Sequence, residues 1–143
     1  AGYSAGAWAS LNLQSKYPDK IKGTIAFNPA FAGHKNEWQK KFPEWGAFRE
    51  QQVNILSQAK TLNAILFAHD KDIFEDTKTL SFFKKFKDLE FVDYSNLKPT
   101  SCKWANVESK MEPSKGHNIP QSRCFTRFIE EKNYLIDFLE NSL

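Results

Sequence analysis

The pentapeptide Gly2-Tyr3-Ser4-Ala5-Gly6 constrains the fold of this chain more than any other segment. A G-x-S-x-G pattern is typical of a sharp turn between a strand and a helix, because small residues let the two elements approach closely. The serine of such a turn is held in a strained backbone conformation. The same pattern also occurs by chance, so an ordinary small-residue turn that opens a helix is the competing interpretation.

The chain after the pentapeptide alternates between helical and strand patterns. Apolar spacing predicts a helix over residues 7–17, and a β-branched and aromatic run predicts a buried strand over residues 21–27. The later expected elements are a loop or short helix at 38–45, a helix at 47–62, a strand at 63–68, a helix at 75–88, a strand at 89–94, a polar connection at 96–116 and a terminal helix at 121–143. Strands separated by helices predict an α/β fold with about three parallel strands flanked by helices.

Composition sets broad limits on organisation and partners. A chain of 143 residues with 41% hydrophobic and 15% aromatic content is expected to form one globular domain, spanning residues 1–143. The net charge of +3 is small and the lysines are scattered, which indicates solvated faces and argues against nucleic-acid binding. No apolar stretch approaches the length of a membrane span.

Candidate catalytic residues follow the expected strands. In a parallel sheet, functional groups gather beyond the carboxyl ends of the strands. Asp70 and Asp72 follow the strand at 63–68 directly, and His117 follows the last strand after a long connection. The order Ser4, aspartate, His117 is the order of an α/β-hydrolase triad. In that arrangement the backbone N–H of Ala5 is the natural first donor of an oxyanion hole.

On these residues the chain resembles the C-terminal half of an α/β-hydrolase, closest to dienelactone-hydrolase-like and related serine esterases. The resemblance is carried by residues 2–8, by Phe27-Asn28-Pro29-Ala30, by residues 68–72 and by Gly116-His117. It implies hydrolysis of an ester-type bond in a small molecule, without a cofactor. It also implies that the N-terminal strands and a second oxyanion donor lie upstream, so that the intact parent is the hydrolase and residues 1–143 alone are inactive.

The resemblance leaves the substrate open, whether carboxylester, thioester, lactone or peptide. Dienelactone hydrolases proper carry a cysteine nucleophile, so Ser4 departs from them and their lactone substrate is not carried over. Members of the α/β-hydrolase fold commonly carry Gly-x-x-Asp after this strand. His69-Asp70-Lys71-Asp72 aligns with that pattern if His69 replaces the glycine, and the alignment selects Asp72 as the acid. Asp70 is then expected to stabilise the turn.

Two other histidines compete with His117 for the role of base. A base must reach the serine hydroxyl from a flexible connection, and the segment around Gly116 and His117 offers one. His69, next to the strand end, is expected to be buried, and His34 to be exposed or near the pocket rim. The spacing of the histidines supports no metal site.

The substrate pocket and the cysteines are less constrained by the sequence. Tyr3, Phe31 and Trp38 are candidates to line the pocket, although such aromatic residues are more often core. Cys102 and Cys124 are either joined or separate. A disulfide between them favours a periplasmic or secreted protein, and its absence favours a cytoplasmic one.

Alternative functions come from two other classes. One is a non-catalytic binding protein of the α/β-hydrolase fold. A serine peptidase or thioesterase of the same fold belongs to neither class, because it is a close variant of the main hypothesis. The other is a nucleotide-binding domain with residues 2–6 as a phosphate loop. This last alternative is disfavoured because the G-x-G-x-x-G pattern and the P-loop lysine are both missing.

Overall fold

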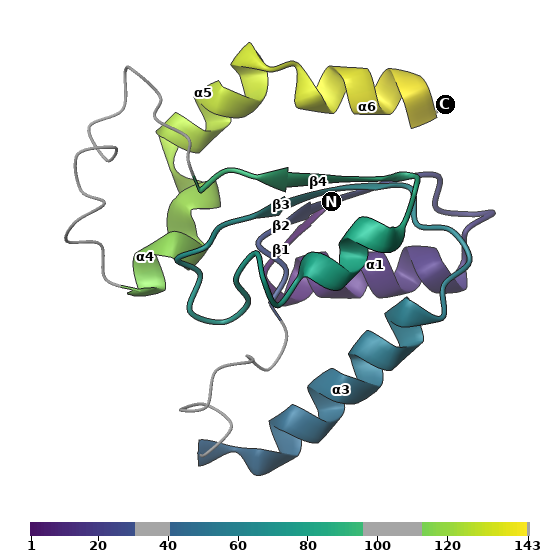
Figure 1. Cartoon of the computed structure of the whole chain (residues 1–143). Coiled ribbons are helices and arrows are strands. Elements are labelled where there is room, and N and C mark those ends of the chain that lie inside the picture. The colour runs from purple at the N-terminus through teal and green to yellow at the C-terminus, as the bar shows by residue number, and fades with distance from the viewer. Residues whose placement is uncertain (31–40, 96–112, 143) are drawn as a thin grey trace.

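The computed structural model describes residues 1–30, 41–95 and 113–142, and it has an α/β fold with a four-stranded parallel sheet flanked by helices (Figure 1). The strands are β1 (Gly2–Tyr3), β2 (Thr24–Phe27), β3 (Ala64–Ala68) and β4 (Leu89–Asp93), and they lie in sequence order across the sheet. The helices are α1 (Ala5–Lys16), α3 (Pro43–Ser57), the 3-10 helix η1 (Ser81–Lys85), α4 (Pro113–Asn118), the 3-10 helix η4 (Ile119–Gln121), α5 (Arg123–Glu131) and α6 (Tyr134–Ser142).

Two hydrophobic clusters cover the two faces of the sheet. Strand β3 is buried along its whole length, and its side chains alternate between the clusters. Leu66 faces the cluster formed with α1, α3 and η1, whereas Phe67 faces the cluster formed with α5. Figure 1 shows the same division, with α5 and α6 on one side of the sheet and α1 and α3 on the other. Parallel strands buried on both faces are the expected arrangement of an α/β fold.

The sheet has four strands, so the expectation of about three was wrong. The additional strand is β1, in which Gly2 pairs with Ala26 and Tyr3 pairs with Phe27 of β2. This strand can be as short as two residues because the backbone of β2 supplies its hydrogen-bond partners. The strands expected at 21–27, 63–68 and 89–94 are present as β2, β3 and β4.

The helix expected at 75–88 does not form as an α-helix. Thr79 donates its backbone N–H to Asp76 Oδ1 at 2.8 Å and its hydroxyl to the Asp76 carbonyl at 3.0 Å. Such local bonds from Asp and Thr compete with helical hydrogen bonding. The chain therefore forms turns and the short helix η1, while the apolar residues predicted to be buried, Leu80, Phe83 and Phe86, are buried.

The single terminal helix expected at 121–143 is two helices. Asn133 adopts a φ of 52° between α5 and α6, which ends the first helix as asparagine often does. Phe128 and Ile129 on α5 are buried, but Ile136 and Leu139 on α6 are more than half exposed. The break thus turns part of the predicted apolar face of the last helix toward solvent.

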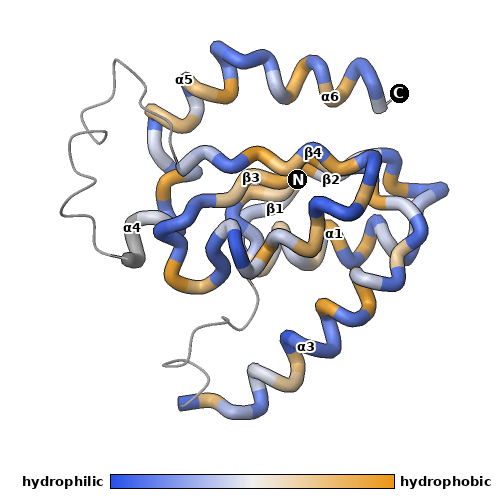
Figure 2. Tube along the Cα trace, viewed as in Figure 1, coloured by the Kyte–Doolittle hydropathy of each residue, from blue (hydrophilic) through white to orange (hydrophobic). Residues whose placement is uncertain are grey.

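Helix α3 occupies much of the segment expected to be helical at 47–62, but it begins earlier, at Pro43, and ends at Ser57. Proline suits the first helical position because its missing N–H has no helical partner there. The apolar spacing of the segment favours a buried stripe that includes Phe48, Ile55 and Leu56, but Phe48 and Ile55 are 44% and 45% exposed, and only Leu56 of the three is buried. The helix leans away from the sheet (Figure 1), and hydrophilic and hydrophobic residues are mixed along it (Figure 2).

Two further features concern the helices and the metal-binding side chains within residues 1–30, 41–95 and 113–142. No helix there is both long and apolar enough to cross a bilayer. In the same ranges, no group of three or more His, Cys, Asp or Glu side chains is arranged to hold a metal ion.

Candidate active site

The candidate site lies at the edge of the sheet where all four strands have their carboxyl ends. Ser4 follows β1, Asn28 follows β2, His69 follows β3 and Tyr94 follows β4. Backbone bonds extend the sheet pairing past the strand ends, since Ser4 N–H donates to Phe27 and Asn28 N–H donates to Phe67. Side chains from distant parts of the sequence therefore meet at one edge.

Ser4 occupies a strained turn between β1 and α1. Its backbone has φ 54° and ψ −124°, a conformation that non-glycine residues seldom adopt. Gly2 makes the turn possible, because a Cβ there would lie 2.3 Å from the carbonyl oxygen of Gly6. A Cβ on Gly6 would meet no described atom within 4 Å. Of the two glycines in the pentapeptide, close packing therefore requires only Gly2.

Ser4, His117 and Asp72 form a hydrogen-bonded line. The Ser4 hydroxyl lies 2.9 Å from Nε2 of His117, and Nδ1 of His117 lies 2.7 Å from Oδ2 of Asp72. An ionised carboxylate only accepts, so Nδ1 carries the proton and Nε2 is free to accept from the serine. The three residues predicted for the triad are thus brought together, with Asp72 fully buried and His117 6% exposed.

Asp72 is oriented by its own loop. Its other carboxylate oxygen, Oδ1, accepts the backbone N–H of Phe74 at 2.8 Å and that of Glu75 at 3.3 Å. Asp70 has a side chain that is 47% exposed, and its carboxylate lies 3.3 Å from Nδ1 of His69. The acid that reaches His117 is therefore Asp72, the one selected over Asp70 from the sequence.

His117 lies on a short helix, not in the flexible loop expected from the sequence. Helix α4 brings it over the strand ends, and Gly116 lets the helix approach the Asp72 loop. A Cβ on Gly116 would lie 2.4 Å from the carbonyl oxygen of Lys71. The imidazole lies between two aromatic rings, with the Tyr3 centroid at 5.1 Å and the Phe74 centroid at 4.8 Å.

Tyr3 is the one pocket candidate within the described residues. Its hydroxyl lies 3.0 Å from the carbonyl oxygen of His117 and 2.9 Å from Oδ1 of Asn118, and burial raises the pKa of the Tyr3 phenol. Its ring borders the imidazole of His117, and its place in a substrate pocket stays a prediction. Phe31 and Trp38, and also His34, lie outside the described residues.

The other sequence expectations around the site have mixed outcomes. His69 is buried as predicted, and its Nδ1 accepts the N–H of Lys71 at 3.0 Å. Ala5 is the first residue of α1, where backbone N–H groups point out of the helix end. Cys124 is disulfide-bonded, and Cys102, the other member of the pair considered, lies outside the described residues.

Sequence reasoning missed the role of Asn28. Its amide Nδ2 donates to the carbonyl oxygens of Gly116 and His117, both at 3.0 Å, and its Oδ1 accepts from the hydroxyl of Tyr94 at 2.7 Å. A φ of 43° directs this buried side chain toward α4. The one available signal was an asparagine, a residue that tolerates positive φ, placed directly after a buried strand.

Sequence reasoning also missed a buried ion pair between α3 and the loop that holds Asp72. Arg49 donates through Nε to Oε1 of Glu75, and through Nη2 to Oε2 at 2.7 Å. Glu75 is fully buried, and its backbone N–H is one of the two that contact Asp72. The expectation that Glu75 begins a helix is wrong, because the backbone bends at Glu75 and the next helix is η1.

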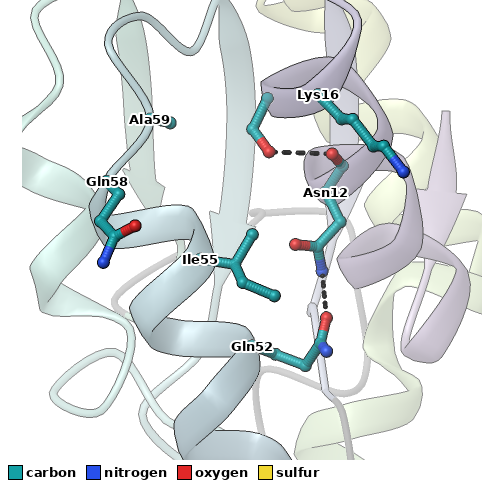
Figure 3. Close-up of a pocket in the computed structure, with 7 residues that line it drawn as sticks. Asn12, Lys16, Gln52, Ile55, Gln58 and Ala59 are labelled. Carbon is teal, nitrogen blue, oxygen red and sulfur yellow. Dashed lines mark hydrogen bonds between the residues drawn. The ribbon is translucent and has the colours of Figure 1, made fainter.

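A separate pocket of about 370 Å³ lies between α1 and α3 (Figure 3). Its lining comes from the later turns of both helices, namely Asn12, Ser15, Lys16, Gln52, Ile55, Gln58 and Ala59. Asn12 donates to Oε1 of Gln52 across the gap at 3.0 Å. The pocket contains none of the three predicted triad residues.

No protein-family model, curated protein or solved structure matches this chain at a significant level. The α/β fold and the geometry of the site are therefore the basis for any functional assignment.

The buried Tyr94 is expected to make the free energy of unfolding depend on pH in alkaline solution. Burial raises the pKa of Tyr94 well above 10.0, so above pH 10 the unfolded chain loses this proton while the native chain keeps it. Because the native state then binds more protons, the free energy of unfolding should fall as pH rises above 10, by up to about 1.4 kcal/mol per pH unit from this one group. Denaturant unfolding from pH 9 to 11 measures the slope.

The Tyr94→Phe variant should have a shallower slope than wild type. Tyr17→Phe, at an exposed position, is the matched control and should keep the wild-type slope. An unchanged slope in Tyr94→Phe would contradict the prediction.

Proposed function

We propose that this chain carries the catalytic triad of a serine hydrolase of the α/β-hydrolase type, acting on an ester-type bond in a small molecule. The observation that carries the proposal is the line Ser4–His117–Asp72, with distances of 2.9 and 2.7 Å. The strained backbone of Ser4 supports it, because strain of this kind clusters at active sites. The order of the three residues along the chain also agrees with this fold type.

In the proposed mechanism His117 accepts the proton of the Ser4 hydroxyl through Nε2 as the serine oxygen attacks the carbonyl carbon. Asp72 holds the imidazole in the required tautomer and stabilises the imidazolium. The backbone N–H of Ala5 stabilises the negative charge on the carbonyl oxygen. His117 then protonates the leaving group, and a water molecule activated by His117 hydrolyses the acyl-enzyme.

Labelling by a fluorophosphonate tests this function in the full-length protein. We expect stoichiometric modification of Ser4, identified by mass spectrometry of the peptide, because the hydroxyl is activated by His117. Ser4→Ala should abolish the labelling. Ser10→Ala is a matched control on α1, since the Ser10 hydroxyl donates to the Gly6 carbonyl at 2.8 Å. Absence of labelling in wild type, or equal labelling of Ser4→Ala, would refute the hydrolase assignment.

The bond type is tested on one acyl group presented as a carboxylester, a thioester and an amide. We expect the largest kcat/KM for an ester-type bond, because its leaving group needs less protonation than an amine. Preference for the amide would assign the protein to the peptidase alternative.

A further inference from the structure

Asn28 is a buried polar residue beside the site, with no part in the proton transfers. It is fully buried directly after β2, where its φ of 43° departs from the strand conformation. A buried amide without partners is costly, so its hydrogen bonds indicate what it does. Its backbone N–H continues the sheet by donating to Phe67 at 2.9 Å, and its side chain is directed at α4.

The orientation of the amide follows from its partners. The carbonyl oxygens of Gly116 and His117 can only accept, so the nitrogen of Asn28 faces them and supplies both of its protons. The oxygen of Asn28 then faces the hydroxyl of Tyr94, which donates to it at 2.7 Å. Every part of the amide is thereby used, and the two carbonyl oxygens, which cannot donate, exclude the flipped orientation.

Helix α4 depends on such external bonds for its position. It has six residues, and a helix this short is not stable by itself. Asn28 binds two consecutive carbonyls of α4, which restrains both the position and the direction of the backbone that carries the imidazole. From β1, the hydroxyl of Tyr3 also meets α4, at 3.0 Å from the His117 carbonyl oxygen and 2.9 Å from Oδ1 of Asn118. The backbone of the proposed base is therefore held from the ends of two strands.

We propose that Asn28, hydrogen-bonded to the hydroxyl of Tyr94, is the positioning residue that holds His117 between Ser4 and Asp72. This inference rests on the proposed function, because it assigns a supporting role to the same site. Asn28 is fully buried and does not touch the reacting atoms, so its loss should lower kcat and leave KM unchanged.

The most direct test is Tyr94→Phe, which removes one hydroxyl and keeps the ring against His69 and Phe125. In the full-length protein we expect kcat for a short-chain ester to fall about 10- to 100-fold, because small misplacement of a catalytic group has effects of this size. KM should stay within about two-fold of wild type. Tyr134→Phe on α6 is the matched control and should keep wild-type kcat, because the Tyr134 ring packs against Phe67 and Phe128, away from the triad.

A proton NMR measurement reports the position of the imidazole without using activity. The Nδ1 proton shared with Asp72 should give a far-downfield resonance in wild type, assigned by its loss in His117→Gln. Tyr94→Phe should broaden or shift this resonance. Asn28→Gly, which tolerates the positive φ but lacks the amide, should remove it and lower kcat further.

Each outcome decides the proposal. Folded Tyr94→Phe and Asn28→Gly variants with wild-type kcat and an unchanged resonance would overturn it. If Asn28→Gly fails to fold, Tyr94→Phe alone decides. If wild type is not labelled by a fluorophosphonate and hydrolyses no ester, the proposed function fails. The positioning role then stands only if both variants alter the resonance, and falls if they do not.

Discussion

Replacing Asp72 with asparagine is expected to lower kcat/KM for ester hydrolysis by about four orders of magnitude, the size of effect known for this change in serine triads. Asparagine has nearly the shape of aspartate, and its oxygen can still accept from Phe74 and Glu75. Its nitrogen would then face Nδ1 of His117 and force the proton onto Nε2. An imidazole with that tautomer cannot accept the proton of Ser4.

Steady-state kinetics of wild type and two variants measure the Asp72 effect. Asp70→Asn changes the same side chain two residues earlier in the same loop, where it is 47% exposed, and should stay within about two-fold of wild type. Circular dichroism and thermal unfolding show whether each variant folds. A large loss in Asp70→Asn, with activity retained in Asp72→Asn, would show that the wrong carboxylate has been assigned.

Adding one methyl group at Gly116 is expected to reduce kcat/KM about 100-fold or more, as misplacement of a catalytic group by about 1 Å does. The Cβ of Gly116→Ala would lie 2.4 Å from the carbonyl oxygen of Lys71 and 2.9 Å from the nitrogen of Asp72. Both atoms belong to the backbone, so α4 and the acid loop must move apart. That movement separates His117 from Asp72.

Gly23→Ala is the matched control for the Gly116 variant. A Cβ at Gly23 would lie 2.8 Å from ring carbons of Phe138, a side chain on α6 that can move. Gly23→Ala should therefore lower the melting temperature while kcat/KM remains close to wild type. Equal activity of Gly116→Ala and wild type, with both folded, would show that close approach of α4 to the acid loop is not needed for catalysis.

The strands show what local sequence patterns can predict. Strands β2 and β3 are runs of β-branched, aromatic or aliphatic residues, and β3 is buried along its whole length, which makes such runs easy to recognise. Strand β4 keeps enough of this pattern in Leu89, Phe91 and Val92, although Glu90 and Asp93 are exposed. Strand β1 has two residues and depends on pairing with Ala26 and Phe27, so a local pattern could not show it. The segment at 75–88 was misread because bonds between Asp76 and Thr79 compete with the helix its apolar spacing predicts.

In the candidate site, too, the sequence predicted some features and the tertiary structure decided others. Residue type, chain order and the family resemblance selected Ser4, Asp72 and His117 from the sequence. The choice of Asp72 over Asp70 needed the resemblance, because two aspartates in one loop differ only in where the turn directs them. The structure supplies that direction through the N–H groups of Phe74 and Glu75 on Asp72.

The sequence by itself determined the α/β class, the place of Ser4 at a tight turn and the identity of the residues that meet there. Only the tertiary structure decided that Asn28 and Tyr94 support His117 and that Gly116 must lack a side chain. The physical reason is separation along the chain. Asn28 lies 89 positions from His117, and Ser4 lies 113 positions from it. Contacts over such separations depend on the course of the whole backbone, which no local pattern of residues encodes.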